Sequence, residues 1–444
     1  MKDCAPIVEK FRELMLEAEN HIWNNPETGF KEFQTSKYME EKFEAMGYEL
    51  TRAGNIPGFY TVVDTGKPGP TVLVLAEMDS VICESHPNAN KKTGAVHACG
   101  HHAQCAAMLG VAGALKDPIV LDKLCGRIKL CLVPAEELLE LEYRSELAKK
   151  GIIKFYGGKP EFLARGYFDD CDLAFMVHVG GEEFFFLNGG SIGNVAKKII
   201  YKGVASHAGS SPSKGANALY AATTGLAAAN AVRETFTEPE MIRWHPIMTE
   251  GGQMVNAIPD KVVLEGQIRG KTFEAIEKAN KKINRALTGA ALSLGCNIEI
   301  IDTPGYAPHK NDLNFMKLSE KAAERAIPHR TYYTGLGYSA GSSDMGDLSC
   351  VMPIIHPYSC RYVGKGHGKD YQIVDHEGAT VDSAKFQIGL LLCLLENDAE
   401  EAKKIIEKFE PRFASIKEYI DYLTSIGTSG DRITYSDDEA KVTL

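Results

Sequence analysis

The chain has 444 residues, of which 44% are hydrophobic and 24% are charged, and its formal net charge is -10. Two domains are expected, because a chain of this length exceeds what one hydrophobic core usually spans. The acidic balance argues against nucleic acid or an anionic membrane as the main partner, although local arginines or metal ions could still bind an anionic substrate.

The 11 cysteines are scattered along the chain and odd in number, which favours a reducing compartment with free thiols or metal ligands. The N-terminal stretch carries charges throughout and lacks the apolar segment that is typical of a signal peptide. No stretch approaches 18 uninterrupted apolar residues, so we expect no membrane span and a cytoplasmic location.

Apolar residues at helical spacing predict two amphipathic helices between residues 7 and 46. Continuous apolar runs then predict strands that are covered on both faces, as in an α/β protein. The predicted strands of this part are residues 59–65, 71–79, 127–137 and 173–180. A helix of small residues at 103–116 would pack closely on their sheet.

Four polar residues follow the apolar runs of these strands: Asp79, Glu136, Glu137 and His178. In open α/β sheets, ligands bind outside the carboxyl ends of the strands. We therefore predict that these side chains belong to one site.

The pattern changes near Gly189 and becomes strand, helix, strand, strand, helix, strand, which is the ferredoxin-like arrangement. The predicted elements are 195–204, 217–236, 242–252, 261–270, 272–295 and 297–302. A glycine-rich α/β pattern returns afterwards. We therefore predict a discontinuous metal-binding domain at 1–190 and 306–400, an inserted domain at 191–305, and a C-terminal extension at 401–444.

The densest group of possible metal ligands is the segment His97-Ala98-Cys99-Gly100-His101-His102, just before a predicted helix. The alternative is a histidine-rich loop that holds no metal. Glu136 and Glu137, at the end of a buried strand, could divide into one metal ligand and one general base, or could simply begin a solvated helix.

Single residues give weaker signals. His178 could be an ordinary core residue, and Asp79 could be a turn residue or could orient a ligating histidine. His367 lies in a glycine-rich loop and could be at the surface. In the inserted domain, His207 or Asn256 could stabilise an oxyanion, and Arg269 could pair with a substrate carboxylate, or each could be a plain loop or surface residue.

The order of these motifs resembles the aminoacylase and carboxypeptidase-G type of co-catalytic metallopeptidases. It is more similar to the amidohydrolase branch that holds indole-acetyl-amino-acid hydrolases, aminobenzoyl-glutamate hydrolase and related dipeptidases. The resemblance runs from about His21 to about Ala384 through HACGH, PAEE, MVHV, SHAG and GGQMVNAIPD. It implies an α/β fold, in which a mixed-sheet catalytic domain of the di-metal aminopeptidase type carries an inserted ferredoxin-like lid and dimerisation domain.

The resemblance also implies roles for single residues. Two divalent ions, zinc or manganese, would be bound by Cys99, His101, Glu137, His178 and His367. Glu136 would be the general base that takes a proton from the attacking water, and Asp79 would stand beside the metal site. His207 would stabilise the oxyanion in the other subunit of a homodimer, while Asn256 and Arg269 would hold the substrate.

Departures from the family pattern stand out at two places. His102 replaces the usual Asp and Gln104 often corresponds to His, and Ser343-Asp344 stands where many relatives carry a Glu-Asp pair. Three functions follow as hypotheses. The first is an amidohydrolase for N-acyl amino acids, dipeptides or aryl-amide conjugates with a free carboxylate. The second is an aminopeptidase on short peptides, and the third is a non-catalytic relative that binds metal or a carboxylate.

Overall fold

The computed structural model describes residues 4–437 and 439–444, and the chain divides into two compact units. Unit 1 comprises Met1–Gly190, His309–Tyr338 and Asp347–Tyr419, and unit 2 comprises Ser191–Pro308, Ser339–Gly346 and Ile420–Leu444. The residues predicted as a C-terminal extension are divided between the two, since α13 (Glu400–Lys408) belongs to unit 1 and α14 (Ile416–Ile426) extends into the part assigned to unit 2.

Unit 1 contains a six-stranded mixed sheet in the order β1-β2-β6-β3-β7-β20. Its strands are β1 (Thr51–Arg52), β2 (Phe59–Asp64), β3 (Thr71–Glu77), β6 (Arg127–Val133), β7 (Leu173–Met176) and β20 (Ile354–Ile355). β6, β3, β7 and β20 are parallel to one another, whereas β2 is antiparallel to β6. Because β3 is buried along its whole length, its sequence is continuously apolar from Val72 to Ala76.

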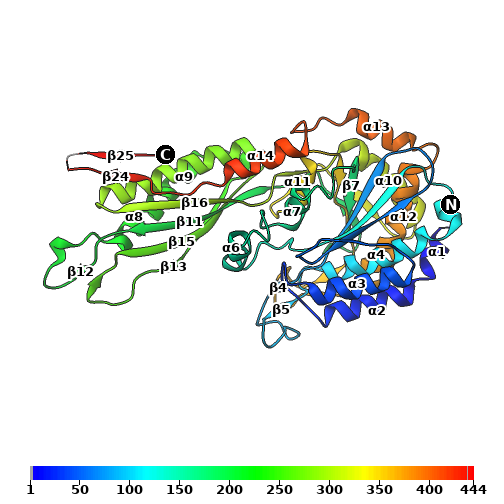
Figure 1. Cartoon of the computed structure of the whole chain (residues 1–444), viewed down its shortest axis with the longest axis horizontal. Helices are drawn as coiled ribbons and strands as arrows, with labels where there is room; N and C mark the ends of the chain where they lie inside the picture. The colour runs from blue at the N-terminus through cyan, green and yellow to red at the C-terminus, as the bar shows by residue number, and fades with distance from the viewer. Residues whose placement is uncertain (1–3, 438) are drawn as a thin grey trace. The chain divides into compact units, whose positions relative to one another are not determined.

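Helices pack against this sheet, and α4 lies between α2 and α12 (Figure 1). The longer helices of unit 1 are α2 (Arg12–Trp23), α3 (Phe33–Ala45), α4 (His101–Leu115), α10 (Leu313–Ala326) and α12 (Ser383–Leu395). The shorter ones are α1 (Ala5–Glu9), α5 (Pro118–Leu121), α6 (Leu141–Lys149) and α7 (Gly158–Ala164). α11 (Met345–Ser349) begins in the part assigned to unit 2 and ends in unit 1. The small residues of α4 allow this close packing, since every side chain from His101 to Leu115 is buried.

Smaller strands complete unit 1. β18 (Tyr332–Thr334), β9 (Phe185–Leu187), β21 (Tyr358–Ser359) and β8 (His178–Val179) form a second sheet in that order. The pairs β4 (Val81–Ile82) with β5 (Ala95–Val96), and β22 (Tyr362–Val363) with β23 (Gln372–Ile373), are short antiparallel ribbons.

Unit 2 has the ferredoxin-like topology that its sequence predicts. The strands β11 (Gly193–Lys202), β13 (Arg243–Glu250), β15 (Lys261–Gly270) and β16 (Asn297–Pro304) form an antiparallel sheet in the order β13-β15-β11-β16. The helices α8 (Ala218–Val232) and α9 (Phe273–Ser293) pack on this sheet and on each other (Figure 1). The ribbon of β24 (Ile433–Tyr435) and β25 (Ala440–Val442) lies next to β16.

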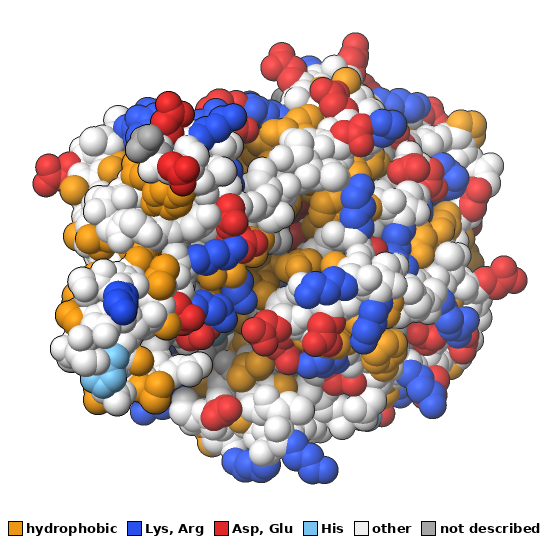
Figure 2. All heavy atoms as spheres, turned by 60° about the vertical axis from the view of Figure 1, so that its left-hand side comes forward, with side chains coloured by type: hydrophobic (Ala, Val, Ile, Leu, Met, Phe, Trp, Pro, Cys, Tyr) orange, Lys and Arg blue, Asp and Glu red, His pale blue; other side chains and the backbone are white. Residues whose placement is uncertain are grey.

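The N-terminal region differs from its prediction as two helices, because the first predicted helix is divided into α1 and α2 at Lys10 and Phe11. One helical stretch in the described part of the chain, Glu377–Leu395, is long and apolar enough to cross a membrane, and 89% of its apolar window is buried inside the protein. Figure 2 shows acidic and basic side chains interspersed over one face, with hydrophobic side chains in small groups between them.

Candidate metal centre

The candidate metal ligands of unit 1 come from four segments, which meet Asp79 near the carboxyl ends of β3, β6 and β7. Asp79 follows β3, Glu136 and Glu137 follow β6, and His178 begins β8 directly after β7. Since these three sheet strands are adjacent and parallel, their carboxyl ends lie at one edge of the sheet.

The segment Cys99–His101 leads into the first turn of α4 through Gly100, whose φ is 93°. A Cβ atom at Gly100 would lie 2.7 Å from the Tyr371 hydroxyl and 3.0 Å from the Val179 side chain, so only glycine allows this turn. His367 approaches from a distant loop, and its backbone N–H donates to the Ala98 carbonyl at 2.8 Å.

Three overlapping groups lie wholly within unit 1, and in each the ligand atoms lie within 4.8 Å of one another. The groups are Cys99, His101 and His178; Cys99, Glu137 and His367; and His101, Glu136 and Glu137. Cys99 Sγ lies 3.5 Å from His178 Nε2, and His367 Nε2 lies 2.9 Å from Glu137 Oε1. The structure thus brings all six of these residues into one cluster.

Asp79 holds two members of the cluster. Its Oδ1 lies 3.1 Å from His101 Nδ1, and its Oδ2 accepts the backbone N–H of Glu137 at 2.8 Å. Because Nδ1 of His101 faces Asp79, Nε2 is the nitrogen left for a metal.

The charges of the cluster depend on one another. Burial opposes ionisation of the Cys99 thiol, but His101 and His178 hold its pKa well below the usual range. Burial, followed by the nearby Cys99, raises the pKa of Glu137 to about 7, while His367 acts in the opposite direction. Cys99 and Glu137 in turn raise the pKa of His367 to about 10.

These residues fit a divalent metal centre. Thiolate, imidazole and carboxylate are together the ligand types of zinc, and the nitrogen and oxygen donors also suit manganese. His101 Nε2 is buried and makes no hydrogen bond to any described residue, although Glu77 Oε2 lies 3.2 Å away. A buried imidazole nitrogen without a hydrogen bond is costly, and a bound cation would satisfy it.

Sequence reasoning missed a group of buried polar side chains beside His101, formed by Glu77, Gln104 and Lys159. Gln104 Nε2 donates to Glu77 Oε2 at 2.8 Å, and Lys159 forms a fully buried ion pair with Glu77. Gln104, which departs from the family pattern, therefore has a buried hydrogen-bond partner in Glu77. Glu77 could have been predicted from its position at the end of a strand, two residues before Asp79. Lys159 could not, because it lies outside every motif.

The second departure, His102, points elsewhere. It is absent from the candidate ligand groups found among the described residues. Its ring packs on Trp23 at 5.0 Å and on His97 at 5.2 Å between centroids, and its Nε2 lies 4.0 Å from Glu19 Oε1.

The three remaining predicted residues lie in unit 2. His207 on β12 (Ser206–His207) is exposed, and its Nδ1 accepts the N–H groups of Gly209 and Ser210. Asn256 is also exposed and close in the backbone, because its carbonyl accepts the Ala208 N–H at 2.9 Å.

Arg269 on β15 donates to Gln267 Oε1 at 2.7 Å and to Ser342 Oγ at 3.2 Å. Its partners in unit 2 are therefore uncharged oxygens. This leaves the charge of the guanidinium available to an anionic group.

Comparisons with known proteins agree with this site. Residues 73–397 match the model of Peptidase family M20/M25/M40. The chain is 28% identical over 361 residues to the Xaa-Arg dipeptidase of Homo sapiens, covering 76% of this chain and 74% of that protein. It is 24% identical over 307 residues to one of the subunits of the p-aminobenzoyl-glutamate hydrolase of Escherichia coli, covering 66% of this chain but only 58% of that relative.

A solved dinuclear metal-binding peptidase of Bacillus subtilis has the same fold, with a TM-score of 0.65 at 20% identity, covering 87% of this chain and 99% of that one. The family match and the hydrolase relatives assign the chain to the metal-dependent amide hydrolases, and its mixed-sheet α/β unit and clustered candidate ligands agree with this class. The chain belongs to Peptidase family M20/M25/M40. The resemblance found in the sequence motifs is thereby confirmed.

Proposed function

We propose that this protein hydrolyses the amide bond of an N-acyl amino acid, a dipeptide or an aryl-amide conjugate that carries a free carboxylate. The observation that carries the proposal is the cluster beside Asp79, in which His101, Glu136 and Glu137 are buried, Cys99 and His178 are partly buried and His367 is exposed. The activities for which relatives are named, which include hippurate hydrolase and N-acetyl-L-cysteine deacetylase, support a small amide with a carboxylate as substrate.

In the proposed site Cys99, His101, Glu137, His178 and His367 hold two divalent ions, zinc or manganese. Such ions activate water at neutral pH and polarise the amide carbonyl. Asp79 fixes the ring of His101, since it lies against Nδ1, and it also fixes the backbone of Glu137.

Glu136 is the proposed general base. It takes a proton from the attacking water as the water oxygen bonds to the carbonyl carbon. It then gives this proton to the amide nitrogen as the carbon–nitrogen bond breaks, so that an acid and an amine leave. His207 donates a hydrogen bond to the developing oxyanion.

Asn256 and Arg269 are proposed to bind the substrate. Arg269 would pair with its carboxylate, for which uncharged neighbours such as Gln267 leave the guanidinium available. We also propose a homodimer formed through the domain at 191–305, in which His207 serves the partner's site, and a cytoplasmic location without nucleic-acid or membrane partners.

The test combines metal content with turnover. Freshly purified protein is analysed for bound metals and assayed for amine release from N-acyl amino acids, dipeptides and aryl-amide conjugates, as wild type and as Glu136→Ala. We expect about two metals per chain in both proteins, and a loss of activity of about 100- to 10,000-fold in the variant. Absence of metal after incubation with manganese and zinc would overturn the proposed site.

The substrate panel separates the alternatives. A requirement for a free N-terminal amine would favour an aminopeptidase on short peptides. Two bound metals without turnover of any substrate would favour the non-catalytic relative that binds metal or a carboxylate.

A further inference from the structure

Unit 1 contains a concave site that is separate from the candidate metal ligands. It is a pocket of about 650 Å³ between α2, the loop at 86–88, the first turn of α4 and the segment 369–376. This volume is in the range of small-molecule sites. None of the proposed metal ligands lines it, although His102 in its wall directly follows His101.

Glu19 of α2 gives the pocket a buried carboxylate. Only 3% of this residue is exposed. Its Oε1 accepts a hydrogen bond from His376 Nδ1 at 2.6 Å, and among the described residues no donor reaches its Oε2. A buried carboxylate is costly unless its oxygens are satisfied, so Oε2 can accept from a ligand in the pocket.

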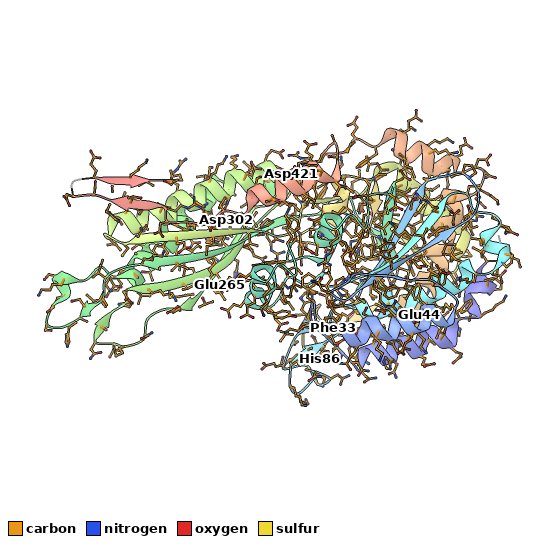
Figure 3. All side chains as sticks on the ribbon, viewed as in Figure 1. Phe33, Glu44, His86, Glu265, Asp302 and Asp421 are labelled. Carbon is orange, nitrogen blue, oxygen red and sulfur yellow. The ribbon has the colours of Figure 1, made fainter. Side chains whose placement is uncertain are left out.

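Aromatic rings lie next to this carboxylate. The Trp23 indole contacts the rings of His102 at 5.0 Å and His86 at 5.9 Å between centroids. His86, labelled in Figure 3 on the loop between β4 and β5, is fixed by a 2.9 Å contact between Nε2 and the Tyr371 carbonyl. An indole ring attracts cations over its face, so Trp23 favours a ligand of the same charge as the Glu19 carboxylate does.

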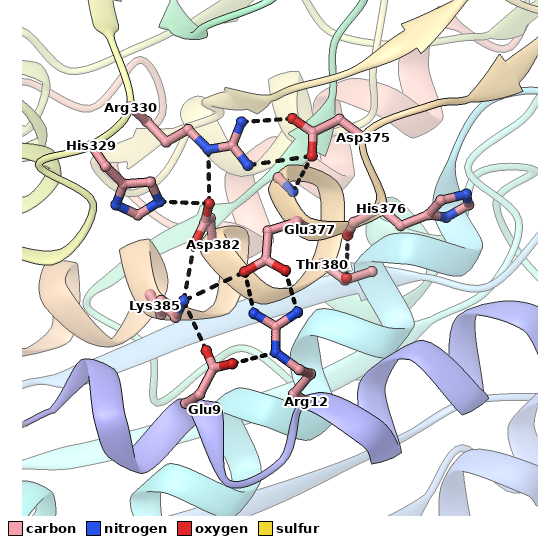
Figure 4. Close-up of polar contacts among 11 residues, drawn as sticks. Glu9, Arg12, His329, Arg330, Asp375, His376, Glu377, Thr380, Asp382 and Lys385 are labelled. Carbon is pink, nitrogen blue, oxygen red and sulfur yellow. Dashed lines mark hydrogen bonds and ion pairs between the residues drawn. The ribbon is translucent and has the colours of Figure 1, made fainter.

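An ion-pair network holds the far wall of the pocket in place (Figure 4). Arg330 donates to both oxygens of Asp375, at 2.6 and 3.3 Å, and to the buried Asp382 at 2.8 Å. Arg12 binds Glu377 through both terminal nitrogens. His376 therefore stands between two anchored carboxylates, and its partner Glu19 is positioned before any ligand binds.

From these contacts we propose that the pocket binds a small organic cation. Its ammonium or guanidinium group pairs with Glu19, and its adjoining carbon chain packs against Trp23. A transition-metal ion fits less well, because within the described residues Glu19, His102 and His376 do not form a group whose donor atoms all lie within 4.8 Å.

The probe for the test is agmatine, which carries a guanidinium and an ammonium group. The chain has two tryptophans, and Trp244 is buried in unit 2, so Trp244→Phe leaves Trp23 as the reporter of the pocket. In this background we expect a saturable change of fluorescence with agmatine. Replacing Glu19 by Gln removes the charge at constant shape and weakens binding at least about tenfold.

Glu13→Gln is the matched control, because it removes the same charge from an exposed position on the same helix and leaves agmatine affinity unchanged. Circular dichroism and thermal unfolding check that the variants fold. Should Glu19→Gln fail to fold, Leu16→Phe, which narrows the pocket from its lining, must weaken binding instead.

Four outcomes overturn the proposal. They are no saturable signal with agmatine, equal affinity in wild type and Glu19→Gln, equal weakening in Glu13→Gln, and a response to zinc alone but not to agmatine. Because binding is read from Trp23 and not from turnover, failure here is distinguishable from failure of the proposed hydrolysis.

Discussion

Two groups of charges, one in each unit, differ in how completely the chain itself satisfies their buried atoms with hydrogen bonds. In unit 2, Lys197 on β11 pairs with Asp302 on β16 and contacts Asn280 Oδ1 at 2.8 Å. Asn280 Nδ2 donates in turn to Asp302 Oδ2 at 2.7 Å. This network is closed, since each charged group has hydrogen-bond partners of the chain itself.

The cluster of unit 1 is open by comparison. His101 Nε2 is buried without a hydrogen bond to any residue described. The carboxylates of Glu77, Glu136 and Glu137 and the sulfur of Cys99 lie close to it. A closed buried network contributes to stability or specificity, whereas an open one is stable only at a cost that a ligand can offset. The contrast is a physical argument in support of the proposed metal site in unit 1.

The largest effect is expected where a closed network is opened. Replacing Asp302 by Asn leaves Lys197 buried without its counter-charge, so we expect the free energy of unfolding to fall by about 3–5 kcal/mol in chemical denaturation. The matched control is Glu265→Gln on the neighbouring strand β15 (Figure 3), whose pair with Lys198 at 3.5 Å is partly exposed. Its loss should stay below about 1 kcal/mol. If both variants lost the same unfolding free energy, the buried pair of Asp302 and the partly exposed pair of Glu265 would not differ in their contribution to stability.

In the open cluster, removal of one charge should leave the stability of the metal-free protein unchanged. In metal-free protein, Glu137→Gln removes one of several crowded charges, so we expect an unfolding free energy equal to that of wild type. Adding manganese or zinc at about a hundred times its dissociation constant should stabilise wild type by ~3 kcal/mol and the variant far less.

The control for this comparison is Glu142→Gln, an exposed change in the same stretch of chain, which should retain the full response to metal. Thermal unfolding with and without a chelator measures all three proteins. Strong destabilisation of the metal-free Glu137→Gln variant would show that the cluster is a closed structural network after all.

The sequence predicts the elements and residues that follow a local pattern better than those whose partners are remote in the chain. Alternation and apolar runs predicted the ferredoxin-like order of unit 2 and the buried strands of unit 1. Strand-end positions predicted that Asp79, Glu136, Glu137 and His178 meet. These signals are local, because they depend on periodicity and on where a strand ends.

Residues whose partners are remote in sequence could not be found in this way. Lys159 pairs with Glu77 across 82 residues, and it follows no strand and belongs to no motif. Glu19 sits in an amphipathic helix, where an acidic residue is ordinarily solvated. Here it lies against α4 and against the segment around His376, 357 residues away. Long-range pairing of this type is a property of the tertiary structure.

The smallest expected effect concerns pH and again separates the two networks. Burial, opposed by Asp302, lowers the pKa of Lys197 from its ordinary value near 10.5 to about 8. Between these values the unfolded chain binds more protons than the folded one, so this group's contribution to stability rises with pH above 8. Up to pH 9.5 the gain is below about 2 kcal/mol.

Lys197→Met has no such proton to lose. The difference in unfolding free energy between wild type and Lys197→Met should therefore shift in favour of wild type from pH 8 to 9.5, and a difference that is constant over this range would mean that the closed network leaves the lysine with its ordinary pKa.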